Sequence, residues 1–165
     1  MKKIARFEKV SKTQFLKDFE GENAEAVFEK IKLPARATSG SAGYDFYAPF
    51  DFSLAPGETI KVPTGIRVKI DEGWVLKIYP RSGLGFKYRL QLNNTVGIID
   101  SDYYNSDNEG HIFIKITNDS NEGKTVELRK GEGFAQGIFI EYGITVDDVT
   151  AGVRNGGFGS TTKQD

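Results

Sequence analysis

From residue 42 onward, hydrophobic and polar residues alternate along much of the chain. The clearest runs are 66–70, 112–116 and 126–128, in which an Ile, Val or Leu occupies every second position. A period of two places these side chains on one face of a strand. Glycine-containing turn signals separate the runs, at 55–57, 71–73, 121–123 and 130–133. Many short strands at this spacing predict an all-β domain: a sandwich, or a distorted jelly roll or barrel of antiparallel strands.

Residues 11–31 are the only stretch with the period of a helix. Ser11 and Gln14 have the spacing of a capping box, and Pro34 marks the exit from the segment. Residues 21–23 interrupt the apolar face, which then resumes at helical spacing. We expect a packed N-terminal helix or helix pair, with a partner-binding helix as the alternative.

Composition narrows the chemistry that the chain can perform. Its 165 residues suit one domain, and they include no Cys and a single His, His111. Thiolate nucleophiles, disulfides and His-rich zinc sites are therefore excluded within one chain. We interpret His111 as the start of a strand, because it opens an alternating run. The remaining carboxylates, Arg, Lys, Tyr and hydroxyls fit phosphate chemistry with Mg²⁺.

Nothing in the sequence indicates a membrane or an export signal. No apolar h-region follows the N-terminus, and no apolar run approaches 18 residues. The net charge is −1, with Lys and Arg spread along the chain, so no polycation surface is available for duplex nucleic acid. We expect a cytoplasmic protein that binds neither membrane nor nucleic acid directly.

Segment 80–85 is a candidate phosphate cradle. Arg81 and Ser82 follow a predicted strand, and Gly83 and Gly85 free the backbone for close approach to an anion. The spacing is not that of a Walker motif. A tight strand-to-helix turn explains the same residues equally well.

Segment 94–103 contains two acidic residues at the end of an apolar run. Asp100 can be partly buried and still reach a cleft, where a carboxylate can orient and deprotonate a water. Asp102 lies on the same face if the segment is extended. We favour a chemical role for Asp100 and a structural role for Asp102, although Asp residues are common in turns for structural reasons alone.

Two further polar residues interrupt apolar strands. Gln136 lies within the apolar run 133–139, and its amide needs partners from the backbone or from a ligand. Asp45 is flanked by aromatic residues in the strand-like segment 41–49. It can anchor a hairpin, or it can face a site.

The end of the chain places one aromatic ring among glycines. Arg154 precedes Phe158 and Gly159, which are followed by the hydroxyls of Ser160 and Thr161. An arginine and hydroxyls suit phosphate, and a flat ring suits a nucleobase. A disordered terminus is the alternative.

Taken in order, these motifs resemble those of the homotrimeric deoxyuridine triphosphatase (dUTPase) family. The resemblance extends from about residue 33 to 162 and includes five segments: AGYDFYAP, PRSGLG, GIIDSDYY, GFAQGIF and RNGGFGST. It implies Mg²⁺-dependent hydrolysis of dUTP to dUMP and pyrophosphate, which limits uracil incorporation into DNA and supplies dUMP for dTMP synthesis. It also implies a homotrimer with active sites between subunits.

The resemblance assigns expected roles to residues of this chain. Asp100 would activate the water that attacks the α-phosphorus, Tyr103 would pack under the deoxyribose, and Phe158 would stack on uracil. The other implied contacts are Arg81, Ser82, Gly83 and Gln136 with the phosphate chain, Asn94, Gly97, Ile98 and Ile99 with the uracil edge, and Arg154, Gly159, Ser160 and Thr161 with the γ-phosphate. No residue is expected to bind Mg²⁺ directly, and Asp45 would reach it indirectly if at all.

The resemblance also predicts a division into an N-terminal helical extension (1–32), a β-barrel core (33–150) and a C-terminal arm (151–165) that completes a neighbour's site. Two features depart from the family pattern: a longer loop at 104–110, and one residue fewer between Arg154 and the Gly-Gly-Phe-Gly element. Two other functions remain open. One is a nucleotide-gated interaction protein that uses the helical extension and the 104–110 loop. The other is a dCTP deaminase, for which the base-binding hairpin lacks a suitable glutamate.

Overall fold

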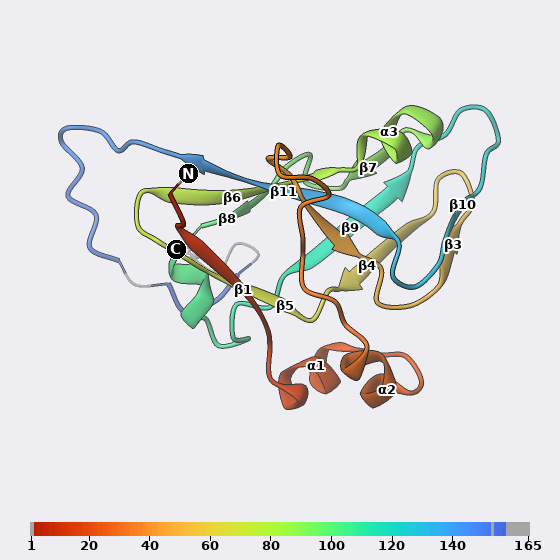
Figure 1. Ribbon diagram of the computed structural model, residues 1–165, viewed down its shortest axis with the longest axis horizontal. Coiled ribbons are helices and arrows are strands. Elements are labelled where there is room, and N and C mark those ends of the chain that lie inside the picture. The colour runs from red at the N-terminus through yellow and green to blue at the C-terminus, as the bar shows by residue number, and fades with distance from the viewer. Residues whose placement is uncertain (1, 153, 158–165) are drawn as a thin grey trace, which may run out of the picture.

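The alternating segments form short antiparallel strands in the computed structural model, which describes residues 2–152 and 154–157 (Figure 1). In chain order the strands are β1 (Ala5–Lys9), β2 (Tyr44–Tyr47), β3 (Phe52–Leu54), β4 (Thr59–Pro63), β5 (Ile66–Ile70), β6 (Trp74–Pro80), β7 (Leu90–Leu92), β8 (Gly97–Ile99), β9 (Phe113–Asn118), β10 (Val126–Leu128) and β11 (Gly133–Glu141). Every pair of these strands is antiparallel. The expected all-β fold class is confirmed.

The strands form two larger sheets and two strand pairs. One sheet has the order β2-β11-β6-β8, the other has the order β4-β9-β7, and β1-β5 and β3-β10 are two-stranded. Strand β11 lies between β2 and β6, and its register with β2 shifts between Gly133 and Ala135. In this arrangement β6 is an interior strand, and β8 lies at the edge of its sheet.

The predicted helical segment forms two helices, α1 (Lys12–Asp18) and α2 (Ala24–Glu29), which lie together on one side of the strands in Figure 1. Ser11 caps α1, since its Oγ accepts a hydrogen bond from the backbone N–H of Gln14 at 3.1 Å. The Gln14 side chain does not complete the capping box. Its Nε2 donates instead to Asp18 Oδ2, one turn further along, at 2.7 Å.

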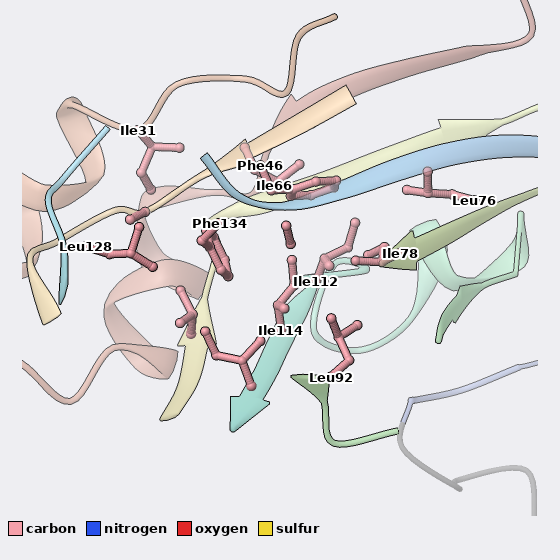
Figure 2. Close-up of a cluster of buried hydrophobic side chains, with 14 of the residues drawn as sticks. Ile31, Phe46, Ile66, Leu76, Ile78, Leu92, Ile112, Ile114, Leu128 and Phe134 are labelled. Carbon is pink, nitrogen blue, oxygen red and sulfur yellow. The ribbon is translucent and has the colours of Figure 1, made fainter. Parts of the chain in front are cut away.

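The hydrophobic core collects side chains from both larger sheets and from the helices. Figure 2 shows Phe46, Leu76 and Phe134 of one sheet gathered with Ile114 of the other and with Ile31, which follows α2. Phe15 of α1 is fully buried. The helices approach the strands so closely that a Cβ at residue 65 would lie 2.3 Å from Ile31 Cδ1, and Gly65 has φ +71°. A glycine is required there, because only glycine adopts this conformation freely and adds no side chain.

Two elements, β1 and the 3₁₀ helix η1 (Asp102–Asn105), were not predicted from the pattern. Helix α3 (Ser82–Tyr88) agrees with the strand-to-helix turn given as one of the two interpretations of segment 80–85. Strand β1 pairs with β5 from Ala5↔Ile70 to Lys9↔Ile66, within the segment expected to be a helical extension. Helices α3 and η1 follow β6 and β8, respectively. The three-part division of the chain into 1–32, 33–150 and 151–165 stays a prediction. Among the residues described, no helix is long and apolar enough to span a bilayer.

Candidate functional site

A pocket of about 470 Å³ lies beside the turn that joins β7 to β8, where the nucleobase hairpin was predicted, and we call it the hairpin pocket. Strands β7 and β8 do not pair with each other: β7 pairs with β9, and β8 pairs with β6. Its lining brings together Asn94, Gly97, Ile98, Ile99 and Tyr103, all of which were expected at a nucleobase and sugar. The turn is tight: Thr95 has φ +66° and donates its N–H to Leu92 O at 2.9 Å. These five predicted residues therefore share one cavity.

The backbone of β8 is suited to hydrogen bonding with a planar ligand. Strand β8 pairs with β6 on one side and, within the described ranges, with no strand on the other. An edge strand presents unpaired N–H and C=O groups. A Cβ at Gly97 would lie 3.1 Å from Ile78 Cβ, so a larger residue there would push β8 away from β6. The pocket wall thus combines apolar side chains with accessible main-chain donors and acceptors.

Tyr103 forms one wall of the hairpin pocket and is nearly buried, at 6% exposure. Its hydroxyl donates to the carbonyl of His111 at 2.8 Å and accepts from Asn108 Nδ2 at 2.8 Å. Burial raises the pKa of this phenol, and the Asn108 hydrogen bond partly opposes that shift. Gly157 packs against the ring, since a Cβ there would lie 2.8 Å from Tyr103 Cε2.

Asp100 and Asp102 lie at the exit of β8, next to the hairpin pocket. Both carboxylates are about half exposed, at 51% and 55%, and both bind the same guanidinium, that of Arg154. Arg154 Nε donates to Asp102 Oδ1 at 2.9 Å, and its Nη2 donates to Asp100 Oδ2. Asp100 therefore has both a nearby cavity and a cationic partner from the C-terminal segment.

A second pocket, of about 730 Å³, lies at the start of α3, and we call it the helix pocket. Its lining includes Arg81, Ser82 and Gln136, three of the residues expected to bind phosphate. Gln136 Nε2 donates to Pro80 O at 3.1 Å, so the backbone satisfies part of this amide. Gly83 belongs to α3, but it does not line this pocket.

Asp45 holds Arg81 in place. Arg81 Nε lies 3.4 Å from Asp45 Oδ1, and Arg81 Nη1 donates to Gly133 O at 3.3 Å. Asp45 Oδ1 thus faces a guanidinium, which suits an indirect role. In the described part of the chain, no three His, Cys, Asp or Glu residues gather as a metal-binding group.

The two pockets are separate. Ile78 of β6 lines the hairpin pocket, and the next two residues, Tyr79 and Pro80, line the helix pocket. The pockets have no lining residue in common in the ranges described. One chain therefore presents the predicted base-binding and phosphate-binding residues on two separate surfaces.

Several participants were not found from the sequence. Lys61 and Lys115, which are cross-strand partners on β4 and β9, line the hairpin pocket. No local motif marks either lysine, and only the pairing of distant strands brings them there. The predicted contacts Phe158, Gly159, Ser160 and Thr161 lie outside the described residues.

His111 is fully buried just before β9. Its Nε2 accepts the N–H of Gly65 at 2.8 Å, so Nδ1 carries the proton and donates to Asp18 Oδ2 at 2.6 Å. Burial lowers the pKa of this imidazole, and Asp18 opposes the shift. His111 was interpreted as the start of a strand; the strand begins two residues later, at Phe113, and the interpretation missed both hydrogen-bond partners of the imidazole.

Comparisons with known proteins agree with the predicted family. Residues 29–162 match a family model described as dUTPase. A deoxyuridine 5'-triphosphate nucleotidohydrolase of Lactococcus lactis subsp. lactis (strain IL1403) is 44% identical over 134 residues, covering 79% of this chain and 88% of the relative. The crystal structure of dUTPase from Streptococcus mutans has a TM-score of 0.64 and 35% identity, covering 86% of this chain and 98% of that one. A mutant phage phi11 dUTPase of S. aureus, which coordinates a structural Mg(II) ion, has the same TM-score at 21% identity and shows likeness of fold alone.

Proposed function

This chain belongs to the dUTPase family, and on that premise we propose that it cleaves dUTP by attack of an Asp100-activated water on the α-phosphorus. The activity itself, that of a dUTP diphosphatase, follows from the family. The proposal concerns how this chain's residues perform it. In the cell the reaction would limit uracil incorporation into DNA and supply dUMP for dTMP synthesis.

The hairpin pocket would bind the uracil and the deoxyribose. Asn94 and the exposed backbone edge of Gly97–Ile99 would pair with the uracil edge, and the narrow hairpin would exclude a methyl group at C5. Shape rejection of one methyl provides about 1–3 kcal/mol, so hydrogen bonds must discriminate against cytosine. The buried Tyr103 ring would lie under the sugar and leave no space for a 2′-hydroxyl.

Asp100 would act as the general base. It lies directly after β8, so a base held by β8 would place its sugar and α-phosphate near this carboxylate. A carboxylate within hydrogen-bond reach of a water can take its proton as the water attacks. Arg154 now pairs with Asp100 Oδ2, and its transfer to the γ-phosphate would free that oxygen for the water.

The phosphate chain would be bound by Arg81, Ser82, Gly83 and Gln136. Three of them, Arg81, Ser82 and Gln136, line the helix pocket, which shares no described lining residue with the hairpin pocket. We therefore propose that each active site combines the hairpin pocket of one subunit with the helix pocket of another, in a homotrimer. The C-terminal arm, with Phe158, Gly159, Ser160 and Thr161, would close the site over the base and the γ-phosphate.

The residues present fit a Mg²⁺ ion that is carried mainly by the substrate. Asp45 is paired with Arg81, and Asp100 and Asp102 are both paired with Arg154, which fits an ion that these carboxylates reach indirectly. Mg²⁺ usually keeps several waters and binds through few carboxylates plus phosphate oxygens. When bound, it neutralises charge on the phosphates, which two arginines alone cannot balance.

The observation that supports the composite site is the separation of the two pockets within one chain, and a mixing experiment tests the proposal. Asp100→Asn and Arg81→Ala variants are each expected to release little pyrophosphate from dUTP. Refolded together, they should regain activity, because random mixing places both native residues at about a quarter of shared sites. Mixed trimers that stay inactive would show that both residues serve the same chain's site.

Substrate choice tests the function itself. Pyrophosphate release should be fast with dUTP and Mg²⁺, and slow with dTTP, dCTP and UTP. Equal rates with dUTP and dTTP would contradict the role proposed for the hairpin. Light scattering on the same sample determines whether the active species is a trimer.

A further inference from the structure

Helix α1 holds the short segment 109–111 from both of its ends. At its N-terminus, the N–H and Oγ of Ser11 donate to the carboxylate of Glu109, at 2.7 and 2.6 Å. At its C-terminus, Asp18 accepts the Nδ1 proton of His111 at 2.6 Å. Gln14 Nε2 donates to the same Asp18 oxygen. The helix therefore brackets the residue between these contacts, Gly110.

The bracketed segment has a constrained backbone. Glu109 has φ +58° and Gly110 has φ +71°. A Cβ at Gly110 would lie 2.7 Å from the carbonyl oxygen of Tyr103, so the segment packs directly on that residue. A left-handed conformation is unfavourable for a glutamate, and its hydrogen bonds to Ser11 offset that cost. Arg67 Nη1 also lies 3.9 Å from Glu109 Oε2.

The same segment fixes the phenol of Tyr103. The hydroxyl donates to the His111 carbonyl and accepts from Asn108 Nδ2, both at 2.8 Å. Asn108 Oδ1 accepts the N–H of Gly110 at 3.2 Å, which orients the amide. Both partners of the phenol are therefore attached to the segment that α1 brackets. Tyr103 itself lines the hairpin pocket.

We propose that α1 sets the sugar selectivity of the enzyme by holding the Tyr103 ring in place, with Asp18, Glu109 and Asn108 as positioning residues. The inference rests on the proposed function, in which Tyr103 excludes a 2′-hydroxyl. The family model begins at residue 29, so α1 lies outside it. The 104–110 loop and the N-terminal helix would then act together to position Tyr103.

The test is the ratio of kcat/KM for dUTP to kcat/KM for UTP, measured with Mg²⁺ on trimers that light scattering has verified. Asp18→Ala and Asn108→Ala should each lower this ratio by roughly three- to tenfold, the effect of one lost hydrogen bond. The loss should come from a higher KM for dUTP and faster turnover of UTP. Asp18→Asn keeps an acceptor for His111 Nδ1–H and should restore most of the selectivity.

The decisive comparison uses the Tyr103→Phe variant, whose ring has no hydroxyl to hold. Adding Asn108→Ala to Tyr103→Phe should leave the ratio of kcat/KM values unchanged. Asp51→Ala is the matched control: this carboxylate accepts the N–H of Lys130 at 2.7 Å, lines neither pocket, and should leave selectivity unchanged.

Three outcomes overturn the proposal. The first is an unchanged ratio in both alanine variants, or in Asn108→Ala alone if Asp18→Ala does not fold. The second is an equal change with and without the Tyr103 hydroxyl. The third is a wild-type enzyme that hydrolyses dUTP and UTP equally, which also removes the sugar role of Tyr103. If the wild type prefers dUTP over UTP and every variant keeps the same preference, the proposed function stands and only the role of α1 is rejected.

Discussion

Lowering the pH from 7.5 to 5.5 should destabilise the folded chain through His111. In the fold, Nε2 accepts the Gly65 N–H and Nδ1 donates to Asp18, so a second ring proton would displace the Gly65 hydrogen bond. The residue is 0% exposed, and burial lowers its pKa below the ordinary value of 6.5. The unfolded chain therefore binds a proton in this range that the folded chain does not.

The magnitude follows from linkage. A group with a lowered folded pKa contributes its full stability above its unfolded pKa, and loses it as the pH falls below that value. If His111 stays neutral in the fold throughout, the free energy of unfolding drops by about 1.4 kcal/mol per chain between pH 7.5 and 5.5. Between pH 5.5 and 7.5 the change in stability can be assigned to His111. The chain has one His, and the pKa values of Glu8 and Glu109 are lowered to below 4.5.

Urea unfolding at pH 5.5, 6.5 and 7.5, at constant ionic strength, measures this slope. His111→Gln offers a carbonyl acceptor to Gly65 but has no proton to gain. Between pH 7.5 and 5.5 the free energy of unfolding of this variant should therefore fall by about 1.4 kcal/mol less than that of the wild type. A single histidine also gives a single imidazole signal in NMR. A titration midpoint at or above 6.5, or a wild type whose stability rises on acidification, would refute the reasoning.

Three other perturbations have defined outcomes. Asp100→Asn should retain dUTP binding and lower turnover by roughly 10²–10⁴-fold, the usual contribution of a general base, as measured by calorimetry and pyrophosphate release. Deletion of residues 153–165 should leave a folded trimer with little activity, and an active truncation would remove the arm from the mechanism. Gly65→Ala should destabilise the fold by about 3 kcal/mol in urea unfolding, since it combines a positive φ with a 2.3 Å approach to Ile31 Cδ1.

The sequence predicted the strands well where one face is buried. The run 66–70 alternates cleanly, and Ile66, Val68 and Ile70 are all buried in β5. Strand β1 escaped this reasoning because residues 5–9 contain a single large apolar residue, Phe7. Its formation depends on pairing with β5, which is 57 or more positions away along the chain. Local periodicity contains no information about such a partner.

The candidate site was predictable as a set of motifs but not as an arrangement. Short motifs found five of the residues that line the hairpin pocket and three of those that line the helix pocket, since each motif is local. Their placement in two separate pockets depends on how β6 pairs with its distant partners β8 and β11. The contact of His111 with Asp18 joins residues 93 positions apart, and spacing along the chain could not predict it.

The ion pairs of Arg154 suit a site that is assembled only when substrate binds. Asp100 and Asp102 are about half exposed and the Arg154 side chain is 20% exposed, and ion pairs that water reaches contribute little to stability. A triphosphate offers Arg154 more negative charge and bidentate oxygen acceptors, so we expect the guanidinium to transfer to it at low cost. The transfer would release Asp100 as the arm closes. A strongly buried pair would instead hold the base inactive, because breaking such a pair leaves an uncompensated charge.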